Sequence, residues 1–464
     1  MSEKVHEGFG SRSIGMIGGV SLLLNNCLGP GVAQMPALFQ KAGWIACTIA
    51  LLIFAVAAFL AGWMLMYAQS RIPISLPRTE YGGICKYFLP RGWFIFTQVF
   101  FILTMIVLCV GGVLQTSQLM DFLFVRIFKK SCAIQIYPNV SLPCASDSDG
   151  FSVFPSGTSV ISAGYVAAAL VTIPFGFFPL EDNIKFQVFS CCAMTLCVLL
   201  WIADFSMMGL HKERVPAWGE SLQGLVGACM FNFCISFSLP SWNNERVETV
   251  GVKKSLAAAI LIATGFMWVI GCFAGTAFDV FYKTSKNLND VIDEENRWMS
   301  VSAMYLFSLA NNITSIPVFS ICIRYCLVEL DIMRKYFASL LSVLLPWILV
   351  IPFSTGEGFS NIIEYGGMVF LSVTGFIIPP FLFYLAIKKD KELTFDGVTD
   401  NSELREHPSR SGSIIANQEF ELIYGKRNSL VAQSVALVLL AVLFSVGIYS
   451  LVYKILLDLS ILDL

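Results

Sequence analysis

The chain has 464 residues, of which 56% are hydrophobic and only 13% are charged, a composition too apolar for an ordinary soluble domain. Its formal net charge of -2 offers no basic excess for a nucleic-acid partner. We therefore predict an all-α integral membrane protein whose surroundings are the lipid bilayer, with no nucleic-acid partner and no obligate protein partner.

Eleven apolar runs of about 20 residues predict eleven transmembrane helices. They cover 14–39, 44–68, 92–125, 158–179, 186–204, 221–241, 254–279, 298–328, 336–353, 360–387 and 430–456. An odd number of spans places the two termini on opposite sides of the membrane. Most Lys and Arg residues fall in segments that are internal if the N-terminal tail is cytosolic, which favours that orientation.

One membrane domain, 14–456, makes up nearly all of the chain on this topology. The remaining segments are a cytosolic N-terminal tail (1–13), an outer loop (126–157), a polar cytosolic loop (388–429) and a short outer C-terminal tail (457–464).

The first predicted helix, 14–39, is interrupted at its centre by residues 25–31, Asn-Asn-Cys-Leu-Gly-Pro-Gly. Freed backbone groups at membrane depth need other partners, so such a break is expected to line a solvated or ligand-filled cavity. A half-helix that starts after Pro30 directs its positive dipole end into that cavity, where it suits a substrate carboxylate. The alternative is a kinked and tightly packed helix, because membrane helices tolerate Pro and Gly.

The outer loop, 126–157, contains the sequence Asn139-Val140-Ser141 between Cys132 and Cys144. A glycan and a disulfide both require a non-cytosolic compartment. We expect glycosylation of Asn139 and a bridge between the two cysteines.

The sixth span, 221–241, repeats the theme of the first. The polar residues Asn232 and Ser236 fall within it, and Pro240 follows. Interrupted helices one and six are what two five-helix halves in inverted orientation produce, with the eleventh span as an addition. The predicted fold is therefore a 5+5 inverted repeat with broken helices 1 and 6 and one extra helix.

The eighth span carries polar residues directly before Pro317, a residue that frees a backbone carbonyl one turn earlier. These residues are Asn311, Asn312, Thr314 and Ser315. Hydroxyl and carbonyl oxygens are hard ligands that suit a small cation. The alternative is hydrogen bonding between helices.

Glu364 and Asp204 are ionisable residues within predicted spans and could relay protons. Both lie near predicted span ends, which favours an interfacial or capping role for each.

The sequence lacks the motifs of several enzyme classes. It contains no Gly-x-x-x-x-Gly-Lys-Ser/Thr loop, no His-Glu-x-x-His and no Gly-x-Ser-x-Gly. This disfavours an ATP-driven pump, a zinc protease and a serine hydrolase. We predict that the protein is not an enzyme, that it has no cofactor, and that an ion gradient supplies its energy.

In these motifs the chain resembles the amino acid/auxin permease family of the amino acid, polyamine and organocation superfamily, including its sodium-coupled neutral amino acid transporters and their proton-coupled relatives. The residues that carry the resemblance are 25–31, Gly43-Trp44, Phe178-Pro179-Leu180, Ser315-Ile316-Pro317, Tyr365-Gly366-Gly367 and Pro379-Pro380. The resemblance implies transport of amino acids by alternating access, with Na⁺ or H⁺ as the co-transported ion.

The resemblance also implies roles for individual residues. The backbone of Gly29 and Gly31 would hold the substrate carboxylate, with Asn26 and Pro30 in the same break. In the family Gly-x-Gly motif the middle residue can donate a hydrogen bond, whereas Pro30 has no N–H, so one donor is missing. The sixth-helix break would face the rest of the substrate through Asn232, Phe233 and Ser236. The coupling ion would be held by Asn25, Leu28, Asn311, Thr314 and Ser315.

Our leading hypothesis is a multi-pass symporter for amino acids, with neutral ones expected, in a plasma membrane or a vacuolar or lysosomal membrane. Two alternatives stay open. One is an amino acid sensor with a transporter fold, and the other is a transporter of another small carboxylate or amine.

Overall fold

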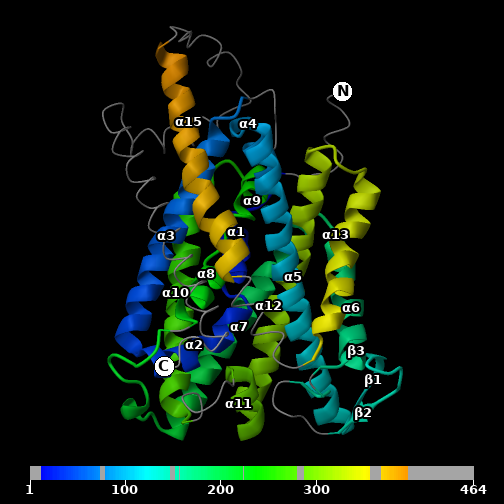
Figure 1. Cartoon of the computed structure of the whole chain (residues 1–464). Helices are drawn as coiled ribbons and strands as arrows, with labels where there is room; N and C mark the ends of the chain where they lie inside the picture. Colours follow the sequence, from blue (N-terminus) through cyan, green and yellow to red (C-terminus); the bar gives the residue numbers. More distant parts are fainter. Residues whose placement is uncertain are drawn as a thin grey trace, which may run out of the picture.

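The computed structural model describes residues 12–73, 79–146, 152–155, 157–222, 224–279, 287–355 and 367–395. Within them the chain forms a bundle of long helices with one small sheet (Figure 1). Seven described helices are long and apolar enough to cross a membrane, and one bent pair would make an eighth. Glu364, the eleventh predicted span (430–456), and residues 1–11, 396–429 and 457–464 lie outside the described residues.

The long helices follow the predicted apolar runs in order. They are α3 (Trp44–Ser70), α5 (Arg91–Phe128), α7 (Leu180–Met208), α10 (Val252–Ala277), α12 (Trp298–Glu329), α13 (Lys335–Val350), and a π-helical segment, η5 (Gly367–Ile377), that continues into α15 (Ile378–Phe395). A 3-10 turn, η4 (Ile351–Phe353), ends α13. This agreement confirms the predicted polytopic helical class.

Two predicted spans are split into short helices. The first consists of α1 (Met16–Cys27), the 3-10 helix η2 (Pro30–Gln34) and α2 (Met35–Ala42). The sixth consists of α8 (Leu225–Asn232) and α9 (Leu239–Glu245). The bend across the first break is 53°. Both breaks fall where the polar residues and prolines predict them.

Local sequence explains several helix boundaries. Pro179 precedes α7, and Glu181 and Asp182 lie in its first turn, where carboxylates stabilise the positive end of the helix dipole. Gly43 joins α2 to α3 with a φ of 85°, a conformation that favours glycine. Three short helices lie in connections and were not predicted: α4 (Tyr81–Phe88), η3 (Lys212–Arg214) and α11 (Leu288–Glu295).

The fourth span differs from its prediction, 158–179, at the N-terminal end. Residues Ser159–Ser162 form a β-strand, and α6 covers only Ala163–Gly176. The helix cannot extend upstream because Ser162 is extended and its hydroxyl caps the helix by accepting the amide N–H of Tyr165, at 3.0 Å.

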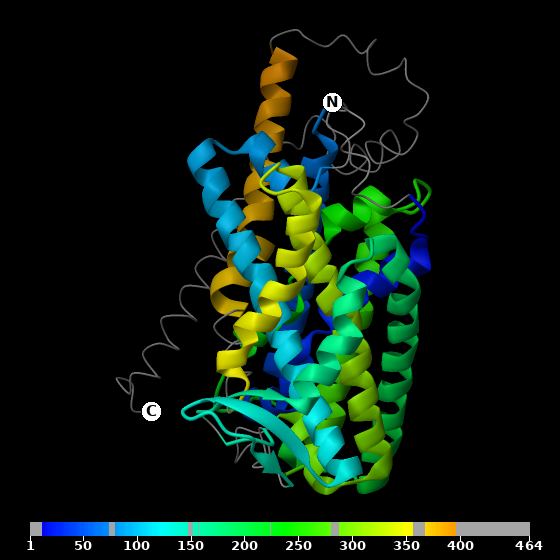
Figure 2. The ribbon, with the colours of Figure 1, turned by 90° about the vertical axis from the view of Figure 1, so that its right-hand side faces the viewer.

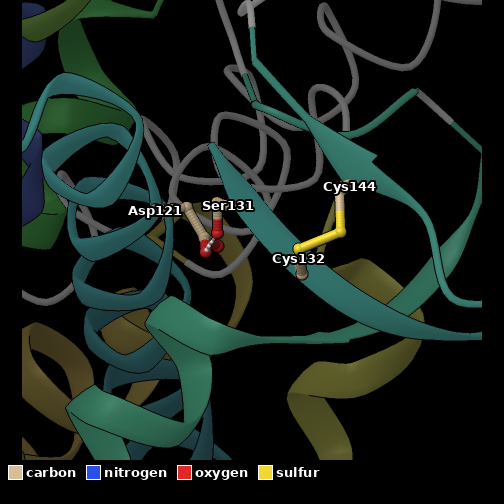
Figure 3. Close-up of a disulfide and its surroundings, with 4 residues drawn as sticks. All are labelled: Asp121, Ser131, Cys132 and Cys144. Carbon is tan, nitrogen blue, oxygen red and sulfur yellow. Dashed lines mark hydrogen bonds between the residues drawn. A yellow bond between two sulfur atoms is a disulfide. The ribbon is translucent and has the colours of Figure 1, made fainter. Parts of the chain in front are cut away.

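The outer loop forms a small antiparallel sheet. Its strands are β1 (Ser131–Tyr137), β2 (Cys144–Ala145) and β3 (Ser159–Ser162), in the order β2-β1-β3. Cys132 lies opposite Cys144 and the two form a disulfide, which confirms the predicted bridge (Figure 3). Asn139 is exposed in the connection between β1 and β2, where a glycan would be accessible.

The carboxylate of Asp121, on α5, holds this sheet to the bundle. It accepts a hydrogen bond from the Ser131 hydroxyl, at 2.7 Å (Figure 3). It also accepts from the Gly164 amide, at 2.9 Å, and from the Ser162 hydroxyl. A buried carboxylate with three donors is well satisfied, so the loop is fixed on α5 rather than loosely attached.

The two ends of the bundle differ. Helices α4 and α9 lie at one end, called the α4 end below, and α11 and the strands lie at the opposite α11 end (Figure 1). Figure 2 shows the strands lying across the α11 end. Between the ends, α1 packs against α7, α10 and α12, so the first helix break is in the interior of the bundle.

Candidate functional site

The two helix breaks lie next to each other. Asn26, near the end of α1, donates its amide Nδ2–H to the Ser238 hydroxyl oxygen, between α8 and α9, at 3.0 Å. A Cβ added to Gly31 would lie 2.9 Å from Asn232 Nδ2. The sequence predicted each break separately, and the fold brings them face to face.

The Gly29-Pro30-Gly31 segment offers backbone donors to this space. The first hydrogen bond of η2 runs from the Val32 amide to the Gly29 carbonyl, at 3.1 Å, so the amides of Gly29 and Gly31 precede it. First-turn amides have no partner within their own helix and suit an anion. Any larger residue at position 31 would require the Asn232 amide to move, because its Cβ would lie 2.9 Å from Asn232 Nδ2.

Four buried asparagines surround the break, and each has at least one amide atom without a hydrogen-bond partner in the described part of the chain. They are Asn25 (Oδ1), Asn26 (Oδ1), Asn232 (Oδ1 and Nδ2) and Asn311 (Oδ1). None is more than 5% exposed. Since each unsatisfied buried polar group costs about 1–3 kcal/mol, their concentration here indicates a place where a ligand or water completes the hydrogen bonds.

A pocket extends from the break toward the α11 end. The pocket is lined by Gly29, Val32 and Ala33 from η2, Gln115 from α5, Trp201 from α7, Leu288 and Asn289 from α11, and Phe307, Ser308 and Asn311 from α12. Mostly apolar walls with a few convergent polar groups are typical of small-molecule sites.

Four of the predicted substrate residues come together at the facing breaks. They are Gly29, Gly31, Asn26 and Asn232. Pro30 opens η2 between the two glycines. Phe233 is buried in the sixth-helix break, and the Ser236 hydroxyl donates to the Gly375 carbonyl on η5, at 3.0 Å. Ser236 therefore ties the break to η5.

All five predicted ion residues lie in one cluster at the crossing of α1 and α12. Asn311 Nδ2 donates to the Leu28 carbonyl, at 2.6 Å, and the Ser315 hydroxyl donates to the Asn25 carbonyl, at 3.5 Å. The Thr314 hydroxyl donates to the Asn311 carbonyl, at 3.0 Å. The family resemblance implied this grouping, and the fold places the residues together although Asn25 and Ser315 are 290 positions apart. Their role as ion ligands stays a prediction.

Two glutamines in this region escaped the sequence analysis. Gln187, on α7, is fully buried, accepts from Asn25 Nδ2 at 2.5 Å and donates to the Thr314 carbonyl at 2.8 Å. Gln115, on α5, accepts from Asn312 Nδ2 at 2.8 Å. The available signal was a long polar amide inside an apolar run, where such residues are expected to face other helices.

Asp204, a predicted proton-relay candidate, is buried near the α11 end of α7. Its Oδ1 accepts from Arg297 Nε at 2.9 Å, and its Oδ2 accepts from the Ser300 hydroxyl. Arg297 lies just before α12, and the hydrogen bond from Arg297 to Asp204 raises the pKa of its guanidinium above the ordinary value. This ion pair joins α7 to α12 and fits the interfacial role that the sequence favoured. Proton relay by Asp204 stays a prediction.

The chain was compared with known proteins. Residues 12–141 match the tryptophan/tyrosine permease family. The fold is similar to that of MhsT in complex with L-phenylalanine, with 12% identity, a TM-score of 0.58 and coverage of 94% of this chain and 100% of that chain. It is also similar to a manganese transporter of Eremococcus coleocola in complex with an aromatic bis-isothiourea substituted compound, with 11% identity, a TM-score of 0.51 and 94% coverage of both chains.

No curated protein matches the chain. At these identities the solved structures show the fold alone. The family match covers less than a third of the chain and agrees with the resemblance to amino acid permeases that the sequence motifs indicate. The seven long apolar helices support a multi-pass membrane protein.

Proposed function

We propose that this chain is a secondary active transporter that carries amino acids across a membrane by alternating access, driven by a cation gradient, with aromatic amino acids as its first candidate substrates. The observation that carries the proposal is the meeting of two helix breaks whose asparagines each keep at least one amide atom without a partner in the described structure. The match to the tryptophan/tyrosine permease family over residues 12–141 supports the aromatic class.

The break has a complementary group for each part of an amino acid. The amides of Gly29 and Gly31 precede the first hydrogen bond of η2 and suit the carboxylate. The Oδ1 atoms of Asn232 and Asn311 have no partner in the described structure and are hydrogen-bond acceptors, so they suit the ammonium group. Because Pro30 supplies no N–H, we expect Asn232 Nδ2, which also lacks a partner, to provide the missing carboxylate donor.

The pocket is lined by aromatic side chains that an apolar substrate side chain would contact. Trp201 and Phe307 line it, with ring centroids 5.2 Å apart. A substrate ring packed against them would gain apolar burial and edge or stacking contacts, worth about 0.5–1.5 kcal/mol beyond area burial. This favours phenylalanine, tyrosine and tryptophan over small amino acids.

We place the α4 end in the cytosol, because most Lys and Arg residues then face inward. The pocket extends toward the α11 end. With the α4 end in the cytosol, the pocket would receive substrate from the non-cytosolic side of the membrane. The membrane is proposed to be a plasma or vacuolar or lysosomal membrane, and Na⁺ and H⁺ are both candidates for the driving ion.

The test is uptake of labelled tryptophan, tyrosine, phenylalanine, leucine and alanine by purified protein in proteoliposomes, with Na⁺ and H⁺ gradients imposed separately. We expect saturable accumulation of the aromatic amino acids with mutual competition. Uptake of none of the five under either gradient would contradict the proposal. Binding without uptake would instead favour the sensor.

A further inference from the structure

The cluster where α1, α7 and α12 cross contains an amide that no sequence motif predicts. Gln187 projects from α7 between Asn25 on α1 and Thr314 on α12. Its Oε1 accepts from Asn25 Nδ2 at 2.5 Å, and its Nε2 donates to the Thr314 carbonyl at 2.8 Å. Gln187 thus lies between two of the residues predicted to hold a coupling cation.

The hydrogen bonds of this cluster supply a donor to each backbone oxygen that the cation would need. The Thr314 carbonyl accepts from Gln187, the Leu28 carbonyl from Asn311 Nδ2 at 2.6 Å, and the Asn25 carbonyl from the Ser315 hydroxyl at 3.5 Å. A bound cation would compete with these donors for the carbonyl oxygens, because it needs several oxygens at once at short distance.

The charges in the cluster also disfavour a cation. Amide N–H groups carry the positive end of their dipole, and three of them, from Asn25, Gln187 and Asn311, are directed into this cluster. In a site of low dielectric, these dipoles stabilise oxygen lone pairs as a cation would and repel a second positive charge. The side-chain oxygens of the five predicted ion residues are amides and hydroxyls, all of them neutral, so no carboxylate among them offsets the charge of a hard cation.

We propose that Gln187 takes the place of a coupling cation at the crossing of α1, α7 and α12, so that transport by this chain does not depend on Na⁺. The inference rests on the proposed function, because its transport test measures amino acid uptake. It removes Na⁺ from the two candidate driving ions. Gln187 is a positioning residue: it holds α1 in register with α12 next to the Gly29-Pro30-Gly31 segment.

The transport test compares uptake of labelled tryptophan into proteoliposomes in NaCl and in choline chloride at equal ionic strength, with the proton gradient held constant. Wild-type uptake should differ between the two salts by less than about fivefold, the lower end of a typical coupling. Gln187→Ala, which removes the donor and opens space beside the Thr314 carbonyl, should lose uptake in choline and regain it in Na⁺.

Two further variants separate the amide from simple packing. Gln187→Met keeps the volume without the donor and should lose uptake in both salts, because it leaves neither a hydrogen bond nor room for an ion. The matched control is Ser190→Ala, also on α7. Ser190 donates to the Ala310 carbonyl at 2.9 Å. The Thr314 hydroxyl also donates to this carbonyl, so the carbonyl keeps one donor when Ser190 is replaced. This control should behave as the wild type.

A binding readout keeps the inference testable without transport. A ligand that binds only the folded state raises the melting temperature, so we compare unfolding of the purified protein in detergent in the same two salts. Na⁺ should leave the wild type and Ser190→Ala unchanged and should raise the melting temperature of Gln187→Ala by about 3 °C or more.

The outcomes that overturn the inference are distinct from failure of the proposed function. A wild-type protein stabilised by Na⁺, wild-type uptake that requires Na⁺, or full activity of Gln187→Met would each contradict it. Absence of amino acid uptake in every condition would contradict the proposed function, and the melting temperatures would then still decide whether Gln187 excludes Na⁺.

Discussion

The helix break and the α4 end both bury polar side chains, but the carboxylate of Glu80 at the α4 end has several hydrogen-bond donors, whereas the amide of Asn232 at the break has no partner in the described structure. At the break, neither amide atom of Asn232 has a partner within the described structure. At the α4 end, Glu80 accepts from Asn244 Nδ2 at 2.8 Å and from the Ser241 hydroxyl. Glu329 accepts the amide of Glu80, at 3.0 Å.

The difference separates two uses of buried polarity. The carboxylates of the α4 end join α9, the second half of the broken sixth helix, to α4 and α12 through completed hydrogen bonds, which hold that end closed. Arg324 adds to the closure by donating to the carbonyls of Gly176, Phe177 and Phe178. At the break, we propose that the substrate supplies the missing partners. On this proposal the hydrogen-bonded carboxylates hold one end together, and the asparagine atoms without partners mark the candidate site.

The largest expected effect is that of Gly31→Val on uptake. The first added carbon would lie 2.9 Å from Asn232 Nδ2, in the space that the substrate needs. We expect tryptophan uptake to fall at least about a hundredfold, as expected when a misplaced group blocks a preorganised site, with normal amounts of protein in the membrane.

Gly265→Val on α10 is the matched control, since an added Cβ there meets no described atom within 4 Å. It should retain uptake. Normal uptake by Gly31→Val would remove the break from the substrate site.

Asn232→Leu tests the unsatisfied side of the comparison. It removes two buried polar atoms that have no partner, so the free energy of unfolding should stay the same or rise by about 1 kcal/mol. Uptake should nevertheless fall by at least about tenfold, the cost of one lost hydrogen bond to a charged group. Thermal unfolding and uptake measured on the same preparation check both parts. A strong loss of stability would show that Asn232 is structural.

Glu80→Ala tests the satisfied side. It leaves the Ser241 hydroxyl and Asn244 Nδ2 without their carboxylate, so we expect the free energy of unfolding to fall by about 1–3 kcal/mol. Asn244 also donates to the Thr79 carbonyl, at 3.3 Å, which limits the loss. Chemical denaturation gives the measurement. An unchanged stability would mean that the α4 end is not held by this carboxylate.

The smallest expected effect is that of Asp204→Asn. The Arg297 side chain is 41% exposed, so water screens the lost charge and the free energy of unfolding should fall by about 1 kcal/mol or less. Uptake driven by a proton gradient should be nearly unchanged if the carboxylate only anchors α7 to α12. Loss of proton-driven uptake alone would instead restore Asp204 as a proton relay.

The sequence located what is local and missed what depends on pairing in three dimensions. The Gly29-Pro30-Gly31 break was predictable because Pro and Gly end a helix on their own. Gln187 was missed because its importance comes from Asn25 and Thr314, which lie on other helices. The start of α6 was wrong because apolar content cannot distinguish a strand that pairs with β1 from the first turn of a helix.

The site shows the same division. The sequence indicated Asn25, Asn26, Asn232 and Asn311, since polar side chains inside membrane spans are costly unless they have hydrogen-bond partners or bind a ligand. Which of their atoms stay unpartnered depends on neighbours contributed by α7 and by the segment between the two halves of the sixth span, such as Ser238. Hydrophobic periodicity contains no information on these contacts.

The most direct test of the account is an experimental structure of the protein with bound L-tryptophan. We predict that the substrate carboxylate lies at the amides of Gly29 and Gly31, that Asn232 contacts the substrate, and that the indole enters the pocket beside Trp201. Substrate bound elsewhere, with the amide of Asn232 still unpartnered, would contradict the central claim that the facing helix breaks form the amino acid site.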